Sequence, residues 1–166
     1  MTNIENEPRA ARSRRQIVIA RFHFFLMFAL ALTVGGCSSF NRAWKAGRTS
    51  AQTNDMQGRW SGTWQSETGG HHHGRLRCLV TERAPGEYDA RFRATYKKIL
   101  SYSYTVPLKV AASGDVYQFS GEADLGSMAG GVYHYEGQAS ATNFFSTYRC
   151  KFDHGTFQMQ RPSPSE

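Results

Sequence analysis

The residues best equipped for chemistry are three consecutive histidines and a few scattered carboxylates. His71, His72 and His73 lie between glycines, and imidazoles in such a tract can bind Zn²⁺ or Cu²⁺. Adjacent side chains of an extended chain point to opposite sides, however, and no nearby acid or thiol has ligand spacing. Glu122 and Glu136 flank a glycine-rich stretch, but nothing places them opposite each other at the separation of a glycosidase pair. Gly-x-Ser-x-Gly and phosphate-loop motifs are absent. We therefore expect no metal, no cofactor and no enzymatic activity.

The first of the three cysteines ends a recognisable processing motif. Residues 32–37 read Leu-Thr-Val-Gly-Gly-Cys, in which small residues close an apolar run and a cysteine follows. This motif resembles the lipobox of bacterial lipoproteins. The resemblance implies cleavage after Gly36, so that Cys37 becomes the first mature residue and carries the lipid.

Residues 1–36 have the composition of a targeting segment. Five arginines precede or begin an apolar run over residues 24–34, which has about eleven residues, whereas a bilayer-spanning helix needs roughly 20. A cleaved secretory signal peptide is therefore the preferred interpretation, with an uncleaved N-terminal anchor as the alternative. Residues 13–17, Ser-Arg-Arg-Gln-Ile, resemble a twin-arginine signal, which leaves the Sec and Tat export routes both open.

Acylation would fix the protein to a membrane without spanning it, because two buried acyl chains suffice for stable anchoring. Lipoproteins retained at the inner membrane are associated with an acidic residue after the cysteine, and Ser38 is not acidic. The resemblance thus implies an outer-membrane location, and we expect the domain to face the periplasm. Five of the 20 basic and two of the 13 acidic residues lie in residues 1–36, so processing lowers the net charge from +7 to +4. This mild balance gives little support to nucleic-acid binding.

Two segments outside the folded part look irregular. Residues 37–57 are rich in Ser, Asn, Gln, Thr, Ala and Gly without a sustained period, which predicts a flexible tether. Alternatively, Phe40 and Trp44 could lie at the lipid headgroups with their basic neighbours. Residues 163–166 are expected to form a disordered tail.

Residues 58–162 read as one all-β domain. Eight short runs alternate or are rich in aromatic and β-branched residues, and turn residues bound each of them. The runs cover residues 59–66, 75–81, 88–97, 102–111, 116–122, 132–139, 143–152 and 156–161. Within residues 88–97, alternate aromatic and small side chains share one face while charged side chains share the other, as in half-buried antiparallel strands. The spacing predicts an antiparallel eight-stranded up-and-down barrel, with a flattened barrel or a β-sandwich as alternatives.

The two ends of this domain resemble lipocalins and their calycin relatives. Gly58-Arg59-Trp60 opens the first run and Arg161 closes the last. Those families carry a G-x-W motif on the first strand and a late arginine that covers the tryptophan. The resemblance implies that Arg161 stacks on Trp60, a contact worth about 0.5 to 2 kcal/mol.

Cys78 and Cys150 are an even pair in an oxidising compartment, which makes them a candidate disulfide worth roughly 4 kcal/mol in the chain-entropy model. They fall on the second and seventh runs, which are not neighbours in a closed barrel, while disulfide Cα atoms lie within about 7 Å. Either the bond is absent or the barrel is flattened. Pro107 within the fourth run adds an expected edge or bulge.

The functional hypothesis is a lipid-anchored, non-enzymatic β-barrel that binds a hydrophobic small molecule or an envelope component. Inward aromatic residues are the candidate ligand contacts: Trp64, Phe92, Tyr96, Tyr104 and Tyr148. An eight-stranded barrel is just wide enough to be filled by its own side chains, however. The alternative is a structural or assembly lipoprotein with a packed barrel that docks another envelope protein.

Overall fold

The computed structural model describes residues 39–49, 55–68, 72–163 and 165–166. The predicted signal peptide, the acylation site Cys37 and His71 lie outside the described residues.

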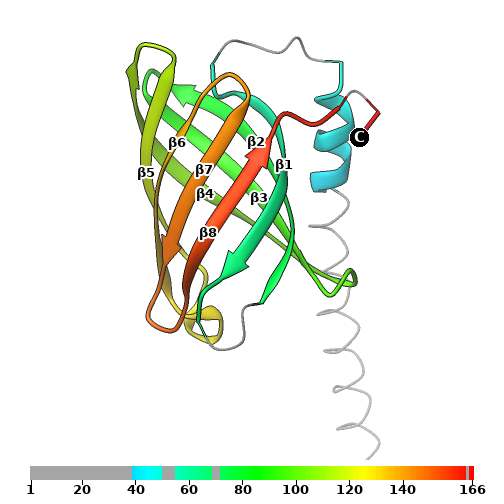
Figure 1. The fold of residues 1–166 in the computed structure, drawn as a ribbon, viewed down its shortest axis with the longest axis vertical. Coiled ribbons are helices and arrows are strands. Elements are labelled where there is room, and N and C mark those ends of the chain that lie inside the picture. Colours follow the sequence, from blue (N-terminus) through cyan, green and yellow to red (C-terminus); the bar gives the residue numbers. More distant parts are fainter. Residues whose placement is uncertain (1–38, 50–54, 69–71, 164) are drawn as a thin grey trace, which may run out of the picture. The chain divides into compact units, whose positions relative to one another are not determined.

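Eight antiparallel strands close into an up-and-down barrel, as predicted from the sequence (Figure 1). The strands are β1 (Gly58–Ser66), β2 (His73–Ala84), β3 (Glu87–Tyr96), β4 (Leu100–Ser113), β5 (Val116–Asp124), β6 (Val132–Ala139), β7 (Asn143–Arg149) and β8 (His154–Gln160). Each strand pairs with the next, and β8 pairs with β1. A short 3₁₀ helix, η1 (Ser127–Ala129), lies between β5 and β6. Because every strand turns back on its neighbour, alternate connections gather at opposite ends of the barrel.

Closure of the barrel depends on a small residue where β1 meets β8. Gly62 pairs with Met159, and a Cβ added at Gly62 would lie 2.0 Å from the carbonyl oxygen of Gln158. A side chain at this position would push the two strands apart. The sequence therefore lets the last strand approach the first closely enough to complete the ladder.

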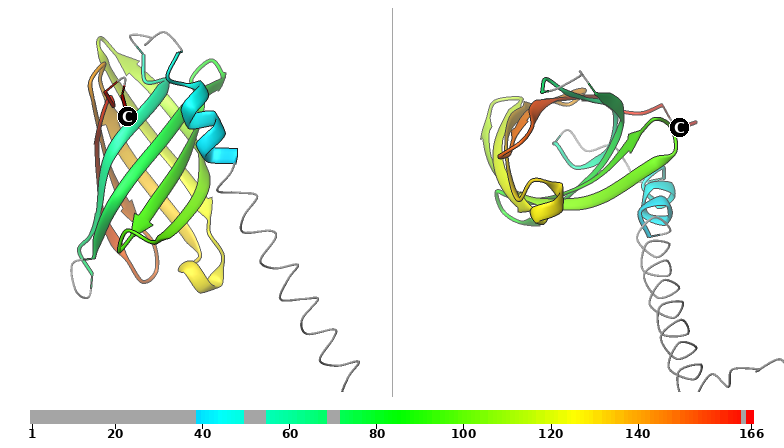
Figure 2. Two further views of the ribbon diagram at one scale, coloured as in Figure 1. Left: turned by 90° about the vertical axis from the view of Figure 1, so that its right-hand side faces the viewer. Right: turned by 90° about the horizontal axis from the view of Figure 1, so that it is seen from below.

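Strand β4 is paired with β5 along only part of its length. It pairs with β3 from Leu100 to Lys109, whereas its pairing with β5 begins at Leu108. Pro107 accordingly lies at the edge of the β4–β5 ladder, where a residue without a backbone N–H is tolerated. The outer part of the β3–β4 hairpin is thus a two-stranded ribbon that extends beyond the closed wall (Figure 2).

The expected tether is wrong for its first described part. Residues 39–46 are helical, and their aromatic side chains contact the outside of the barrel. Phe40 and Trp44 are buried and stack on each other at 6.0 Å between ring centroids. Arg59 lies 4.4 Å from the Trp44 ring, and Arg91 lies 5.6 Å from the Phe40 ring. Arginines on the outer faces of β1 to β3 therefore hold this helix through cation–π contacts.

The expected disordered tail is also held in part. The Glu166 carboxylate accepts a hydrogen bond of 2.6 Å from the Ser61 hydroxyl, and the backbone oxygen of Glu166 accepts one of 2.6 Å from Arg48. Arg48, Ser61 and Glu166 come from three separate segments of the chain. Their hydrogen bonds hold the last residue beside the helix.

Cys78 and Cys150 are both free thiols, so the candidate disulfide is not formed. Cys78 pairs with Trp60, whereas Cys150 follows the end of β7, next to the Arg149–His154 pair at the opposite end of the barrel. The barrel is closed rather than a two-sheet sandwich, and β8 and β1 separate the two strands. Two cysteines at different heights on non-adjacent strands cannot reach the Cα separation of a disulfide.

Candidate functional site

One end of the barrel is capped by Arg161. Its guanidinium carbon lies 3.8 Å from the centroid of the Trp60 ring, the pair that the lipocalin resemblance implied. Nη1 and Nη2 donate to the backbone oxygens of Gln57 and Asp55, and Nε donates to that of Ala141 at 3.1 Å. Burial lowers the pKa of Arg161, but the charge is spread over three carbonyl oxygens and an indole face. We call this the capped end.

The indole nitrogen of Trp60 completes the cap. It donates a 2.9 Å hydrogen bond to the backbone oxygen of Met56, whose side chain is buried in the core. Residues 55–57 are thereby held across the capped end, because their backbone oxygens accept hydrogen bonds from both Arg161 and the indole N–H of Trp60. These contacts are structural, because all three nitrogens of the Arg161 guanidinium donate to backbone oxygens.

Three of the five aromatic residues proposed as ligand contacts, Phe92, Tyr104 and Tyr148, pack against other rings in the barrel. Phe92 is 2% exposed, and its ring centroid lies 5.3 Å from that of Phe157 and 5.5 Å from that of Tyr104. Tyr148 is buried against Phe157, at 5.0 Å. Such centroid separations are those of packed aromatic pairs. The centre of the barrel is therefore filled by its own rings.

The other two proposed contacts lie near the end opposite the cap, which we call the far end. Trp64 pairs with Gly74, and its Nε1 lies 3.4 Å from the backbone oxygen of Thr95. Tyr96 is the last residue of β3, and its hydroxyl lies 3.2 Å from Nδ1 of His72. The structure thus divides the predicted set between the packed centre and the far end.

A tyrosine cluster occupies the barrel between its centre and the far end. It consists of Tyr104, Tyr133, Tyr135 and Tyr148, with consecutive ring centroids 6.0 to 6.4 Å apart. Burial raises the pKa of all four hydroxyls, so they stay protonated at neutral pH. The Tyr135 hydroxyl is buried and interacts with the Tyr104 hydroxyl, but it forms no well-aligned hydrogen bond within the described residues.

Asp153 organises the polar contacts next to this cluster. Its two carboxylate oxygens accept hydrogen bonds from the Ser66 hydroxyl at 2.6 Å and from the Tyr148 hydroxyl at 3.0 Å. His154 joins this network only through Thr68, whose backbone N–H donates to the Ser66 hydroxyl and whose own hydroxyl lies 3.0 Å from His154 Nδ1, so the serine has no direct imidazole contact among the described residues. We read the group as a structural tie between β1 and the β7–β8 turn.

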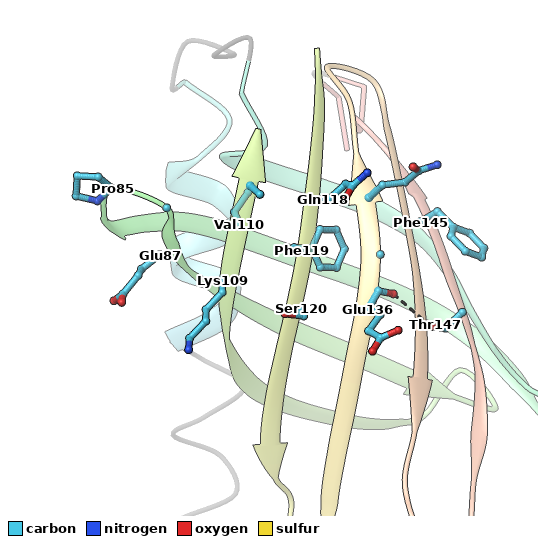
Figure 3. A pocket seen from close by; sticks show the side chains of 14 residues that line it. Pro85, Glu87, Lys109, Val110, Gln118, Phe119, Ser120, Glu136, Phe145 and Thr147 are labelled. Carbon is cyan, nitrogen blue, oxygen red and sulfur yellow. Dashed lines mark hydrogen bonds between the residues drawn. The ribbon is translucent and has the colours of Figure 1, made fainter. Parts of the chain in front are cut away.

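The outer wall of β4 to β7 carries a shallow, open hollow of about 960 Å³ (Figure 3). Gly86 and Gly137 contribute no side chains to it, while Lys109, Gln118 and Glu136 border it with outward-facing polar groups. Thr147 donates its hydroxyl to the backbone oxygen of Glu136 at 3.3 Å. The hollow is a trough in a solvated sheet surface, in which the charged residues Glu87 and Lys109 are cross-strand partners.

The histidines that could have bound a metal are dispersed. Among the described residues, no group of three or more His, Cys, Asp or Glu side chains has metal-binding geometry. His72 contacts Tyr96, and His134 lies 2.8 Å from Glu122 on the solvated outer face of β5 and β6. Glu122 and Glu136, considered as an acid pair, lie on neighbouring strands and both face solvent.

The far end carries a set of residues that the sequence reasoning did not single out. The β3–β4, β5–β6 and β7–β8 connections each expose a large apolar side chain at their tips, namely Ile99, Met128 and Phe152. Ile99 is 80% exposed, Met128 fully so and Phe152 62%. Ile99 and Met128 fall between predicted strands, whereas Phe152 was expected as the last residue of the strand run 143–152, and the structure places it beyond the end of β7.

Comparisons with known proteins give no further assignment. No protein-family model matches the chain, and no curated protein matches it significantly. In the described part of the chain, no helix combines the length and hydrophobicity needed to cross a membrane.

Proposed function

We propose that this protein is a lipid-anchored cell-envelope lipoprotein whose packed β-barrel acts through its outer surface. The observation that carries this proposal is the filled interior: Phe92 contacts aromatic rings from several strands, and the capped end is tied shut by Arg161. Of the two roles considered from the sequence, a structural or assembly lipoprotein fits this interior better than a carrier with an internal cavity.

The proposed anchor lies close to the barrel in the chain. Ser39 begins the described helix and contacts Arg91 of β3, with 2.6 Å between its hydroxyl oxygen and Nη2. Only Ser38 separates Ser39 from Cys37, and two residues span at most about 7 Å. An acylated Cys37 would therefore hold the barrel directly at the membrane, without the slack of a long tether.

The location is tested by fractionating cells that produce Cys37→Ser or, as the matched control, Ser38→Ala. We expect the wild type and Ser38→Ala in the outer-membrane fraction and Cys37→Ser outside it, because only the cysteine can form the thioether. Retention of Cys37→Ser in that fraction would rule out the acyl anchor.

Binding of a small hydrophobic molecule is the second candidate, favoured by the buried Tyr135 hydroxyl of the tyrosine cluster, which interacts with the Tyr104 hydroxyl without a well-aligned hydrogen bond. A ligand with a hydrogen-bonding group could satisfy this hydroxyl. Displacement of an environment-sensitive fluorophore such as 1-anilinonaphthalene-8-sulfonate tests it. Saturable binding that is lost in Tyr135→Phe but kept in Tyr117→Phe would support a carrier, whereas equal weak binding to all three would exclude it.

A further inference from the structure

The two ends of the barrel differ sharply in the residues at their turn tips. At the capped end, the β2–β3, β4–β5 and β6–β7 connections contain no large apolar residue: they consist of Pro85 and Gly86, of Gly114 and Asp115, and of Ser140, Ala141 and Thr142. At the far end, all three connections that the structure describes in full carry an exposed large apolar residue. The exposed apolar residue next to a capped-end turn is Val116, the first residue of β5, and at 36% exposed it is less exposed than Ile99, Met128 or Phe152.

The β3–β4 hairpin is the most pronounced of the three tips. Leu100 and Tyr102 are exposed beside Ile99, on the stretch of β4 that pairs with β3 alone. Lys97 and Lys98 both adopt the left-handed conformation, with φ of 47° and 65°. Glycine or asparagine would occupy such a turn at a lower energetic cost. The turn therefore keeps two strained lysines next to two exposed apolar residues, a combination typical of a functional surface rather than of a stable hairpin.

Charge and aromatic content at the far end suit a phospholipid surface. Lys151 precedes Phe152, with its Nζ 5.1 Å from the ring centroid, and Lys97 and Lys98 precede Ile99. Each of these two apolar tips is thus flanked by an ammonium group that can pair with a lipid phosphate. Tyr102 and Tyr133 lie behind the tips, partly exposed, and tyrosine favours the headgroup region of a membrane. Glu67, Asp124 and Asp153 lie at the same end, but Asp153 is engaged with Ser66 and Tyr148, and Asp124 with the backbone N–H of Gly126.

We infer that the far end of the barrel docks on an anionic phospholipid bilayer, with Ile99, Met128 and Phe152 entering the interface. This inference rests on the membrane location proposed above and names the surface that meets the membrane. The apolar tips supply the buried area, and the lysines supply electrostatic attraction to anionic headgroups.

The experiment uses the full chain purified from its host membrane and reconstituted in vesicles of phosphatidylethanolamine and phosphatidylglycerol. A Cys150→Ser background removes the half-buried thiol, while the buried Cys78 remains because burial raises the pKa of its thiol and shields it. Single cysteines replace Ile99, Met128 or Phe152 and carry a nitrobenzoxadiazole dye, and a doxyl-labelled lipid serves as the quencher. Ser113→Cys at the capped end is the matched control.

We expect strong quenching at all three far-end positions and none at Ser113→Cys. Quenching at none of the three, or at only one, overturns end-on docking, and a protein partner would then be the better occupant of these tips. A chain that does not sediment with the vesicles also overturns it. The mass of the Cys37 peptide from the same sample reports the anchor separately, so failure of the docking and failure of the proposed location are distinguishable.

A second set of variants tests the energetics of docking. Ile99→Ser and Phe152→Ser are compared with Val116→Ser and Phe145→Ser, which remove exposed apolar side chains elsewhere on the barrel. We expect the first pair, but not the second, to weaken the quenching of a dye at Met128→Cys at least several-fold. Equal effects of the two pairs contradict a specific far-end surface.

Discussion

Arg161 shows how one side chain closes an end of the barrel. It combines an indole stack with three hydrogen bonds to backbone oxygens from two separate segments. Lysine cannot reproduce this planar fork, because its ammonium is a point donor on a flexible stem.

We therefore predict that Arg161→Ala lowers the free energy of unfolding by about 2 kcal/mol. Arg161→Lys should recover less than half of this loss. Urea denaturation measures both, with Arg149→Ala, an exposed arginine on β7, as the control that should change little. Equal stability of Arg161→Ala and the wild type would mean that the cap contributes nothing.

Phe92 tests whether the interior is packed. Since it contacts rings from several strands and is 2% exposed, Phe92→Ala should cost about 3 to 5 kcal/mol. Phe145→Ala on the outer face should cost under about 1 kcal/mol. A small loss at Phe92 would indicate a loosely filled barrel and favour the carrier role.

The buried tyrosines make stability depend on alkaline pH. Burial raises the pKa of Tyr104 and Tyr148 in the folded chain above the ordinary value of 10.0. Above pH 10 the unfolded chain therefore holds fewer protons than the folded chain, so the free energy of unfolding falls as pH rises. Below that pH these groups contribute no slope. Urea titrations at pH 8 and pH 11 check this, and Tyr148→Phe should show a smaller difference between the two; an unchanged difference would contradict the assignment.

At the scale of elements, the helix at residues 39–46 covers a row of arginines that strand pairing brings together. Arg77 and Arg93 are direct cross-strand partners, and like charges in such positions destabilise a sheet. Phe40 and Trp44 lie over these strands, and Asn41 accepts a 2.9 Å hydrogen bond from Arg93. The helix therefore offsets a repulsion that the barrel alone would retain.

We predict that Trp44→Ala lowers the free energy of unfolding by about 3 kcal/mol and makes stability rise with salt, because uncovered arginines repel each other until ions screen them. Lys45→Ala, on the exposed side of the helix, should change neither quantity appreciably. Thermal unfolding at low and high ionic strength is the measurement. A salt dependence like that of the wild type would show that the helix does not screen these charges.

The strands could be predicted from the sequence because alternation and turn residues are local signals. In β3, alternate aromatic and charged residues fixed both the strand and its inward face, and the structure places Phe92 inside as predicted. The helix was missed because Phe40 and Trp44 are its only large apolar residues, and because its stability comes from arginines that lie far away in the sequence. The far-end surface was missed because its three apolar residues are far apart in the sequence. Only the closed barrel brings their turns to the same end.

At the scale of the whole molecule, the charges are not spread evenly, contrary to the impression given by their alternation along the chain. Outward arginines gather on β1 to β3, whereas outward acids are divided between β2–β3 and β5–β6. When two strands with alternating charged residues pair, their outward arginines become neighbours and form one basic patch, as at Arg77 and Arg93. In the proposed function, the acyl anchor and the apolar tips hold the barrel at a membrane, and the helix covers part of its outer surface.

The mass of the amino-terminal peptide of the protein extracted from its host membrane tests this account most directly. We predict a peptide that begins at Cys37 and carries thioether-linked diacylglycerol with an N-acyl chain. An unmodified peptide that continues from Gly36 into Cys37 would contradict the account.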